Sequence, residues 1–379
     1  MLIRSRSFNK KIVFLLRTFI LAGLLLLIST SFWQYQYIIN STNIIIQNQS
    51  PLTIKTQLVH VKKKIIVPLK LPSIRCIVFA RFRTGRFGNR MFTMATAYAL
   101  ARLHSCHLFF SPIMLQEIRS IFVFTLPPIL LSIPMFKMVL KNSSHPMKKI
   151  TRDIICQYLP ELTYPNAIGE GSIFEVKGHW QSYLHFDKYR DELRNHLFVA
   201  RQSLLEKVSK LFSNIYEQKF HFKPQFSLEN HQLFKKQLAQ SNWTTWIGIH
   251  IRRDDFVPLN FSSSDEYLFA AIDYYMRRYP NAHFIVASDD KSYCKNLFRH
   301  RSNIIVTPKS FSMGDDLIAL SLCEHSIITG GTFGWWTGYL ASGEVIHDTM
   351  YISGCEKDEH YYPPWFKTHL NLRKDKNIL

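Results

Sequence analysis

Three short segments combine arginine, glycine and hydroxyl side chains directly after predicted strands. The first, residues 85–90 (GRFGNR), lies between an apolar stretch that ends at Ala80 and a helical pattern that begins at Met91. Glycines allow a backbone to approach a ligand closely, Arg86 supplies a cation, and N–H groups at a helix start attract anions. The Gly-x-x-Gly spacing is neither a Walker loop nor a dinucleotide fingerprint. The segment predicts an anion site, with a structural tight turn as the alternative.

The second segment, residues 250–255 (HIRRDD), follows the apolar stretch 246–249. A guanidinium group can hold two phosphate oxygens at once, so Arg252 at a strand end can bind a diphosphate. Arg253, its neighbour, points to the opposite side and can pair with a carboxylate. The alternative is a surface cluster of ion pairs.

The third segment, residues 329–336 (TGGTFGWW), offers hydroxyl and N–H groups at a helix start, which again suits phosphate. Trp335 and Trp336 are expected in the core rather than as a sugar platform. Asp316, at the start of the preceding helix, is expected either to cap that helix or to accept hydrogen bonds from a guanine or a ribose.

The chain contains no Asp-x-Asp motif, the pattern with which many sugar-nucleotide transferases hold Mn²⁺. Cationic side chains would then neutralise the leaving group, and we expect no metal ligands and no metal requirement.

The elements around these segments indicate an α/β fold. Apolar stretches at 76–80 and 107–110 predict strands, and strands alternate with helices from residue 246 to residue 347. Such alternation predicts a parallel sheet with helices on both faces, and ligands bind at the carboxyl ends of its strands. The apolar stretch 121–140 contains three prolines and is expected to cover the core rather than to span a membrane.

The N-terminal region predicts a membrane anchor. Residues 1–11 are basic, and residues 12–33 are apolar enough to cross a hydrocarbon core of about 30 Å. We expect a cytosolic tail at 1–11, an uncleaved signal anchor at 12–33, a stem at 34–72 and a lumenal remainder. A cleaved signal peptide is the alternative.

Composition fits this placement. The chain has 379 residues, 47% of them apolar, which excludes a disordered protein. Its net charge of +20 fits an anionic small ligand, an anionic glycan or a membrane surface, or a basic solvated face. Behind an anchor no nucleic-acid partner is expected. Six cysteines permit up to three disulfides, and five Asn-x-Ser/Thr triplets become possible glycosylation sites.

Together the motifs carry a family resemblance. The segments GRFGNRMFTMATAYALARLH, HIRRDDF, FIVASDDKSYCKNLF and TGGTFGWWTGYLASGEVIH resemble, in order, the motifs of Golgi α1,2-fucosyltransferases, and the chain resembles a divergent, invertebrate-like member. The resemblance implies two Rossmann-like lobes of the GT-B type, an acceptor-side lobe at 73–240 and a GDP-fucose-binding lobe at 241–379. It also implies a single-pass type II protein of the Golgi membrane.

The resemblance also implies roles for single residues. The residues implied to bind the donor are Arg86, Phe87, Gly88, Asn89, His250, Arg252, Asp316, Thr332 and Phe333. Asn89 is also placed within reach of the acceptor. Arg90 and Asp254 depart from the family pattern, which has glutamine and glycine there, and Asp254 adds negative charge near a phosphate site.

The implied reaction transfers L-fucose from GDP-fucose to the 2-hydroxyl of a terminal β-galactoside, with inversion and without a metal. Arg252 would stabilise the departing diphosphate, and Asp255 is the first candidate for the base, before Asp254 and Glu175. A salt-bridging role is the alternative for Asp255. Two other functions stay open: fucosyl transfer of another linkage or to another acceptor, and a catalytically weak, membrane-anchored glycan-binding protein.

Overall fold

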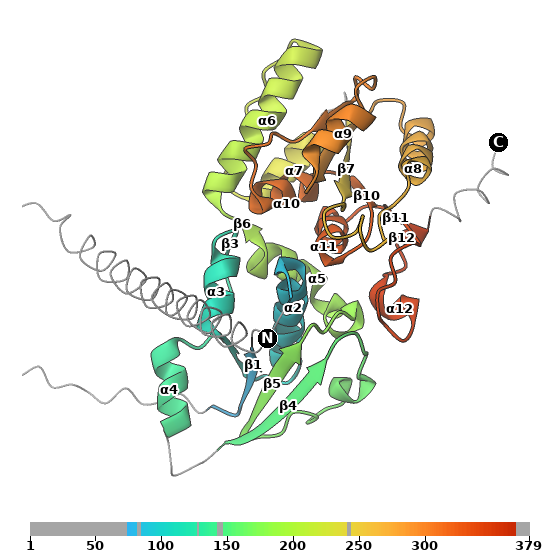
Figure 1. Ribbon diagram of the computed structural model, residues 1–379. Helices are drawn as coiled ribbons and strands as arrows, with labels where there is room; N and C mark the ends of the chain where they lie inside the picture. The colour runs from blue at the N-terminus through green and yellow to red at the C-terminus, as the bar shows by residue number, and fades with distance from the viewer. Residues whose placement is uncertain (1–73, 82–84, 127–128, 142–146, 241–243, 369–379) are drawn as a thin grey trace, which may run out of the picture. The chain divides into compact units, whose positions relative to one another are not determined.

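The computed structural model describes residues 74–81, 85–126, 129–141, 147–240 and 244–368 (Figure 1). These residues belong to one compact unit, Leu71–Leu379. The predicted tail, anchor and stem (1–72) lie outside the described residues. Within the described part, no helix is both long and apolar enough to cross a membrane.

A four-stranded parallel sheet forms from the first part of the described chain. Its strands are β1 (Cys76–Ala80), β2 (His107–Phe110), β4 (Lys148–Ile154) and β5 (Ser172–Gly178). They lie in the order β2-β1-β5-β4, and α2 (Phe87–Leu103) connects β1 to β2. The strands predicted at 76–80 and 107–110 are confirmed, whereas β4 and β5 were not anticipated.

A six-stranded parallel sheet forms from the second part, in the order β12-β11-β10-β7-β8-β9. Its strands are β7 (Thr245–Ile251), β8 (Ala282–Ser288), β9 (Ile304–Val306), β10 (His325–Ile328), β11 (Val345–His347) and β12 (Phe366–Thr368). The helices between them are α8 (Asp265–Arg278), α9 (Lys291–Leu297), α10 (Met313–Ser321) and α11 (Thr332–Ala341). The predicted strand-helix alternation is confirmed.

Shorter elements complete the described chain. The helices are α3 (Pro112–Arg119), α4 (Ile133–Lys141), α5 (Arg190–Glu192), α6 (Gln202–Phe220), α7 (His231–Gln240) and α12 (Asp358–Tyr361). The turns of 3₁₀ or π helix are η1 (Pro160–Thr163), η2 (Tyr183–His185), η3 (Asp187–Tyr189) and η4 (Leu193–Leu197). Strands β3 (Phe122–Val123) and β6 (Val199–Ala200) pair antiparallel. In the stretch 121–140, Leu131 and Phe136 pack into a hydrophobic cluster beside the first sheet, as a core-covering segment should.

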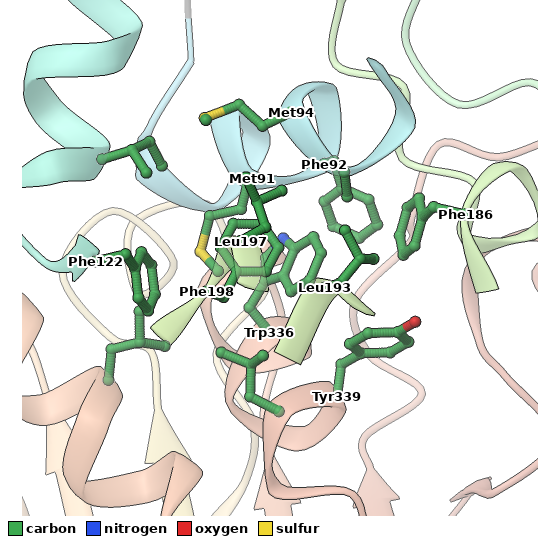
Figure 2. Close-up of a cluster of buried hydrophobic side chains, with 14 of the residues drawn as sticks. Met91, Phe92, Met94, Phe122, Phe186, Leu193, Leu197, Phe198, Trp336 and Tyr339 are labelled. Atoms are coloured by element: carbon green, nitrogen blue, oxygen red, sulfur yellow. The ribbon is translucent and has the colours of Figure 1, made fainter. Parts of the chain in front are cut away.

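The core centres on two helices that are buried along most of their length, α2 and α11. A helix with apolar residues on most of its faces must be buried on most of its faces. Figure 2 shows Met91 and Phe92 of α2 beside Trp336 and Tyr339 of α11, and the ring centres of Phe92 and Trp336 are 5.0 Å apart. Trp335 and Trp336 are fully buried, which confirms the prediction that they belong to the core.

Four of the six cysteines form disulfides. Cys76 pairs with Cys106 inside the first sheet region, and Cys156 pairs with Cys355 across 199 residues of sequence. Cys294 and Cys323 are buried free thiols. The second disulfide joins the segment after β4 to the segment after β11.

Candidate active site

The three segments singled out in the sequence meet around one cavity of about 990 Å³. The cavity is lined by all the residues implied to bind the donor and by the first candidate base: Arg86, Phe87, Gly88, Asn89, His250, Arg252, Asp255, Asp316, Thr332 and Phe333. The other two candidate bases, Asp254 and Glu175, do not line it. Strands β7 and β10 are parallel neighbours in the six-stranded sheet, so the segments that follow them lie at the same edge of that sheet. The segment after β1 comes from the four-stranded sheet and reaches the cavity through the contact between the starts of α2 and α11.

The starts of α2 and α11 touch each other at Gly88. A Cβ atom at this position would lie 2.6 Å from the Thr332 hydroxyl and 2.9 Å from the Phe333 backbone nitrogen. The Trp336 indole also donates a hydrogen bond of 2.9 Å to the Gly88 carbonyl. Only glycine therefore allows the two helix starts to lie this close.

Neither of these two helix starts has a side-chain cap. Arg86 precedes α2 and Gly331 precedes α11, and neither makes a capping side-chain hydrogen bond. Gly331 has a φ of +89°, a conformation that favours glycine. Uncapped N–H groups and the positive ends of two helix dipoles thus face one cavity, an arrangement that attracts an anion.

Arg252 is the central cation of the cavity. Its guanidinium donates to one Asp255 carboxylate oxygen from Nε at 2.8 Å and from Nη2 at 2.6 Å, and its side chain is only 14% exposed. It lies 5.3 Å from the Phe256 ring centre, which adds a cation–π contact. Arg253 does not line the cavity: it stacks at 3.5 Å on Tyr293, and its Nε lies 3.8 Å from Asp290. The predicted opposite directions of the two arginines are confirmed.

Asp255 bridges two arginines. Its second oxygen lies 3.1 Å from Nη2 of Arg86, so one carboxylate joins the segment after β1 to the segment after β7. Both oxygens are engaged by guanidinium groups. Asp254, Asp255 and Asp289 have carboxylate oxygens within 4.8 Å of one another, so negative charge also gathers here.

His250 is buried behind Phe333, with ring centres 5.1 Å apart. Burial lowers the pKa of His250 to about 4, so its imidazole is neutral at pH 7. Within the described residues its Nδ1 has no hydrogen-bond partner, and a Cβ atom at Gly334 would lie 2.6 Å from it. The glycine therefore makes room for the ring beside the start of α11.

Asp316 forms a buried ion pair with Lys291, a cavity residue that sequence reasoning missed. The lysine Nζ lies 2.8 and 3.0 Å from the two carboxylate oxygens and also donates to the Pro308 carbonyl at 3.0 Å. Burial raises the pKa of Asp316, although Lys291 acts in the opposite direction. Lys291 follows Asp290, which caps α9, and the pattern Asp-Asp-Lys after a strand is the signal that could have revealed it.

A second group of cavity residues carries no charge. This uncharged wall consists of Asn89, Ile155, Gln181, Tyr351 and Ser353. The Gln181 amide donates to the Asn89 side-chain oxygen at 2.8 Å, and the Gln181 backbone N–H donates to the Ile155 carbonyl at 2.9 Å. The resemblance stated above placed Asn89 within reach of the acceptor. Sequence reasoning missed Ile155, Tyr351 and Ser353, which stand in loops without a recognisable motif.

One candidate base is corrected by the structure. Glu175 lies on β5 outside the cavity lining, with Lys149 Nζ at 3.0 Å and the Thr151 hydroxyl at 2.6 Å. Burial raises the pKa of Glu175, but these hydrogen bonds and Arg81 outweigh it and lower the pKa overall. Glu175 is thus part of a structural ion-pair network, and the prediction that it can serve as the base is wrong.

The two departures from the family pattern have different surroundings. Arg90 pairs with Glu117 and donates to the Gly85 carbonyl at 3.2 Å, so it braces the turn before α2. Asp254 is exposed, and the ion pair of Arg253 is made with Asp290.

The chain is similar in sequence to known fucosyltransferases. Galactoside alpha-(1,2)-fucosyltransferase 2 of Sus scrofa is 26% identical over 311 residues, which cover 76% of this chain and 79% of that protein. Galactoside 2-alpha-L-fucosyltransferase SEC1 of Bos taurus is 27% identical over 296 residues, which cover 75% of this chain and 69% of the relative.

Among solved structures, a mutant of Arabidopsis thaliana FUT1 in complex with GDP matches 72% of this chain and 70% of its own, with 14% identity and a TM-score of 0.42. The sequence profile of the family described as glycosyl transferase family 11 matches residues 41–368. Because that match spans most of the chain, the resemblance inferred from the motifs is confirmed, and this protein belongs to glycosyl transferase family 11.

Proposed function

We propose that the protein transfers L-fucose from GDP-fucose to the 2-hydroxyl of a terminal β-galactoside, with inversion and without a metal. One observation carries the proposal: in a family 11 chain, two uncapped helix starts, Arg252 and Arg86 converge on one cavity. The names of the relatives from Sus scrofa and Bos taurus supply the sugar, the acceptor and the linkage.

The diphosphate of the donor is proposed to lie against the starts of α2 and α11. Arg252 then neutralises the charge that grows on the leaving group, and the N–H groups near Gly88 and Thr332 bind phosphate oxygens. A neutral His250 can donate one further hydrogen bond. Asp316, held by Lys291, accepts hydrogen bonds from the nucleoside.

Asp255 is proposed to act through the arginines. Since its two oxygens engage Arg252 and Arg86, its contribution is to hold both guanidinium groups at the cavity. We therefore assign no side-chain base. An oxocarbenium-like transition state can react with a hydroxyl that is only weakly activated, so the reaction does not require a strong base here.

We also propose how the domains are arranged and where the protein resides in the cell. Residues 73–240 and 241–379 form the acceptor-side and donor-side lobes of a GT-B arrangement, each with its own parallel sheet. Residues 12–33 anchor the protein in the Golgi membrane, with the catalytic part in the lumen.

The test uses the full chain in detergent with GDP-fucose and a terminal β-galactoside. We expect the protein to release GDP and to form an α1,2-linked product, at the same rate in EDTA as in Mn²⁺. A dependence on Mn²⁺ would contradict the metal-free mechanism and direct attention to Asp254, Asp255 and Asp289. A product of other linkage would contradict the acceptor assignment, and GDP binding without any turnover would favour a glycan-binding protein.

A further inference from the structure

The side chains that line the cavity are of two chemical kinds, ionic and uncharged. Its ionic residues include Arg86, Arg252, Lys291 and Asp316, whereas the uncharged wall defined above has none. A nucleoside diphosphate needs the ionic part, and a neutral sugar needs apolar surface with a few well-placed hydrogen-bonding groups. The two parts therefore suit the two halves of a reaction between a charged donor and a neutral acceptor.

The uncharged wall begins directly beside the central cation. Tyr351 stacks on Phe256, with ring centres 5.6 Å apart and planes 12° from parallel, and Phe256 in turn faces Arg252 at 5.3 Å. Both rings lie over Gly330, where a Cβ atom would be 2.5 Å from Phe256 and 2.7 Å from Tyr351. A sugar on this wall would thus lie next to the group that stabilises the leaving diphosphate.

The uncharged wall includes an apolar side chain that is exposed to solvent. Ile155 is 61% exposed although it lines the cavity, and it precedes Cys156. Exposed aliphatic and aromatic groups around a cavity mark a binding surface when polar groups lie among them. Here the Asn89 and Gln181 amides are those polar groups.

A disulfide holds the two halves of the wall together. Ile155 and Ser353 come from segments that are far apart in sequence. The disulfide between Cys156 and Cys355 holds the Cα atoms of these two cysteines 4.6 Å apart. The Cys355 backbone N–H also donates to the Ser353 hydroxyl at 3.2 Å. The bond thus ties the Ile155 segment to the Tyr351 segment at the cavity itself.

We propose that the uncharged wall is the acceptor subsite for the terminal β-galactoside and that the Cys156–Cys355 disulfide positions it. The inference rests on the proposed function and assigns its acceptor site. The C–H face of the sugar packs on Ile155 and Tyr351, and its hydroxyls bond the Asn89–Gln181 amide pair. The disulfide is a positioning element and touches no reacting atom.

Binding of methyl β-D-galactoside to the full chain in the presence of GDP tests this, measured by saturation-transfer NMR. Ile155→Ala is expected to weaken galactoside binding about five- to tenfold and to leave GDP affinity unchanged. The matched control is Ile113→Ala, an isoleucine of similar exposure (59%) on α3 outside the cavity lining, with no effect expected. Equal effects of both substitutions, or a loss of GDP affinity in Ile155→Ala, would overturn the subsite.

The positioning role has its own pair of variants. Cys156→Ser/Cys355→Ser is expected to raise the KM for the galactoside about tenfold while the KM for GDP-fucose stays constant. Cys76→Ser/Cys106→Ser removes the other, buried disulfide and should lower the Tm without separating the two KM values. A parallel rise of both KM values in the first pair would contradict positioning.

These outcomes separate the subsite from the proposed function. A wild-type chain that binds galactoside at Ile155 but never consumes GDP-fucose would refute the reaction and keep the subsite. A chain that transfers fucose to the galactoside with the same KM in Ile155→Ala would keep the reaction and refute the subsite. If the double cysteine variant does not fold, the comparison of Ile155→Ala with Ile113→Ala still tests the acceptor subsite.

Discussion

The helices of the second sheet begin in two different ways. Ser264, Asp290 and Ser312 cap α8, α9 and α10 with side-chain hydrogen bonds to backbone N–H groups. In contrast, Gly331 precedes α11 and Arg86 precedes α2 of the first sheet region, and neither makes a capping side-chain hydrogen bond. A capped start is satisfied by its own chain and contributes stability, whereas an uncapped start leaves N–H groups for a bound anion. Helices α3 and α6 also begin without a side-chain cap, but they do not line the cavity. The starts of α2 and α11 are therefore distinguished by being uncapped and lying at the cavity together.

The strongest way to break this comparison is to remove the cation beside the uncapped starts. Arg252→Ala is expected to lower kcat/KM about 10²- to 10³-fold, since charge stabilisation at the leaving group is lost. Arg253→Ala, one residue away and outside the cavity lining, should change it by less than about threefold. Steady-state kinetics with GDP-fucose measure both, and equal losses would contradict the assignment.

The second test moves the uncapped starts apart. Gly88→Ala places a methyl group against Thr332 and the Phe333 backbone nitrogen, and is expected to weaken GDP binding about 100-fold. Gly169→Ala is the control, because a Cβ atom there meets nothing within 4 Å. Calorimetry of GDP binding gives the answer; unchanged affinity in Gly88→Ala would show that the contact between the helix starts is unimportant.

A smaller effect is expected from charge near the same starts. Asp254→Gly removes a negative charge that repels a diphosphate and should raise GDP affinity about three- to fivefold. Asp273→Asn is the control and should not change GDP affinity, because this half-exposed aspartate of α8 lies outside the cavity lining and pairs with Arg301. Reduced affinity in Asp254→Gly would indicate that this carboxylate supports the site.

A capped start should respond in stability alone. Ser312 and Asp315 form a capping box at α10, so Ser312→Ala is expected to lower the free energy of unfolding by about 1 kcal/mol. GDP affinity should stay constant. Urea denaturation and calorimetry on the same sample distinguish the two quantities, and a weaker GDP affinity at constant stability would reverse the comparison.

The opposite ends of α10 and α11 give the mildest test. Buried Lys235 donates to the Ser321 carbonyl at 3.2 Å and also to the Ala341 carbonyl. Burial, and then Arg194, lowers the pKa of Lys235 to about 7, against about 10.4 in an unfolded chain. Between these values the unfolded chain binds more protons, so stability should rise with pH.

Denaturation between pH 7 and pH 10 measures this slope. In Lys235→Met the contribution of this residue should disappear, with GDP affinity unchanged. Identical slopes in the two proteins would show that Lys235 keeps an ordinary pKa.

Much of the fold could be predicted because it follows from local patterns. The strands β1 and β7 are short apolar stretches, and a helix with a recognisable pattern follows each of them. Strand β4 was not predicted, because it is a polar edge strand with the sequence KKITRDI and mostly exposed side chains. Edge strands carry charges that protect against aggregation, and these charges hide the strand pattern.

The candidate site also has residues that could be predicted from the sequence and residues that could not. Residues near Arg252 and Thr332 were predictable because they directly follow strands of a parallel sheet. Ile155 and Tyr351 were not, since only tertiary contacts and a disulfide bring their loops to the cavity. Nor could the sequence show that Glu175 turns into an ion-pair network, because its partners Lys149 and Arg81 depend on strand order.

Because of the Cys156–Cys355 bond, the acceptor side of the cavity also depends on the compartment in which the chain folds. Disulfides persist in oxidising compartments and are rare where thiols are kept reduced. A molecule folded in a reducing compartment would have the same helix starts and the same Arg252, but the Ile155 and Tyr351 segments would not be joined. Such a molecule should still bind GDP-fucose with unchanged affinity, but it should need about ten times more galactoside for the same rate of transfer.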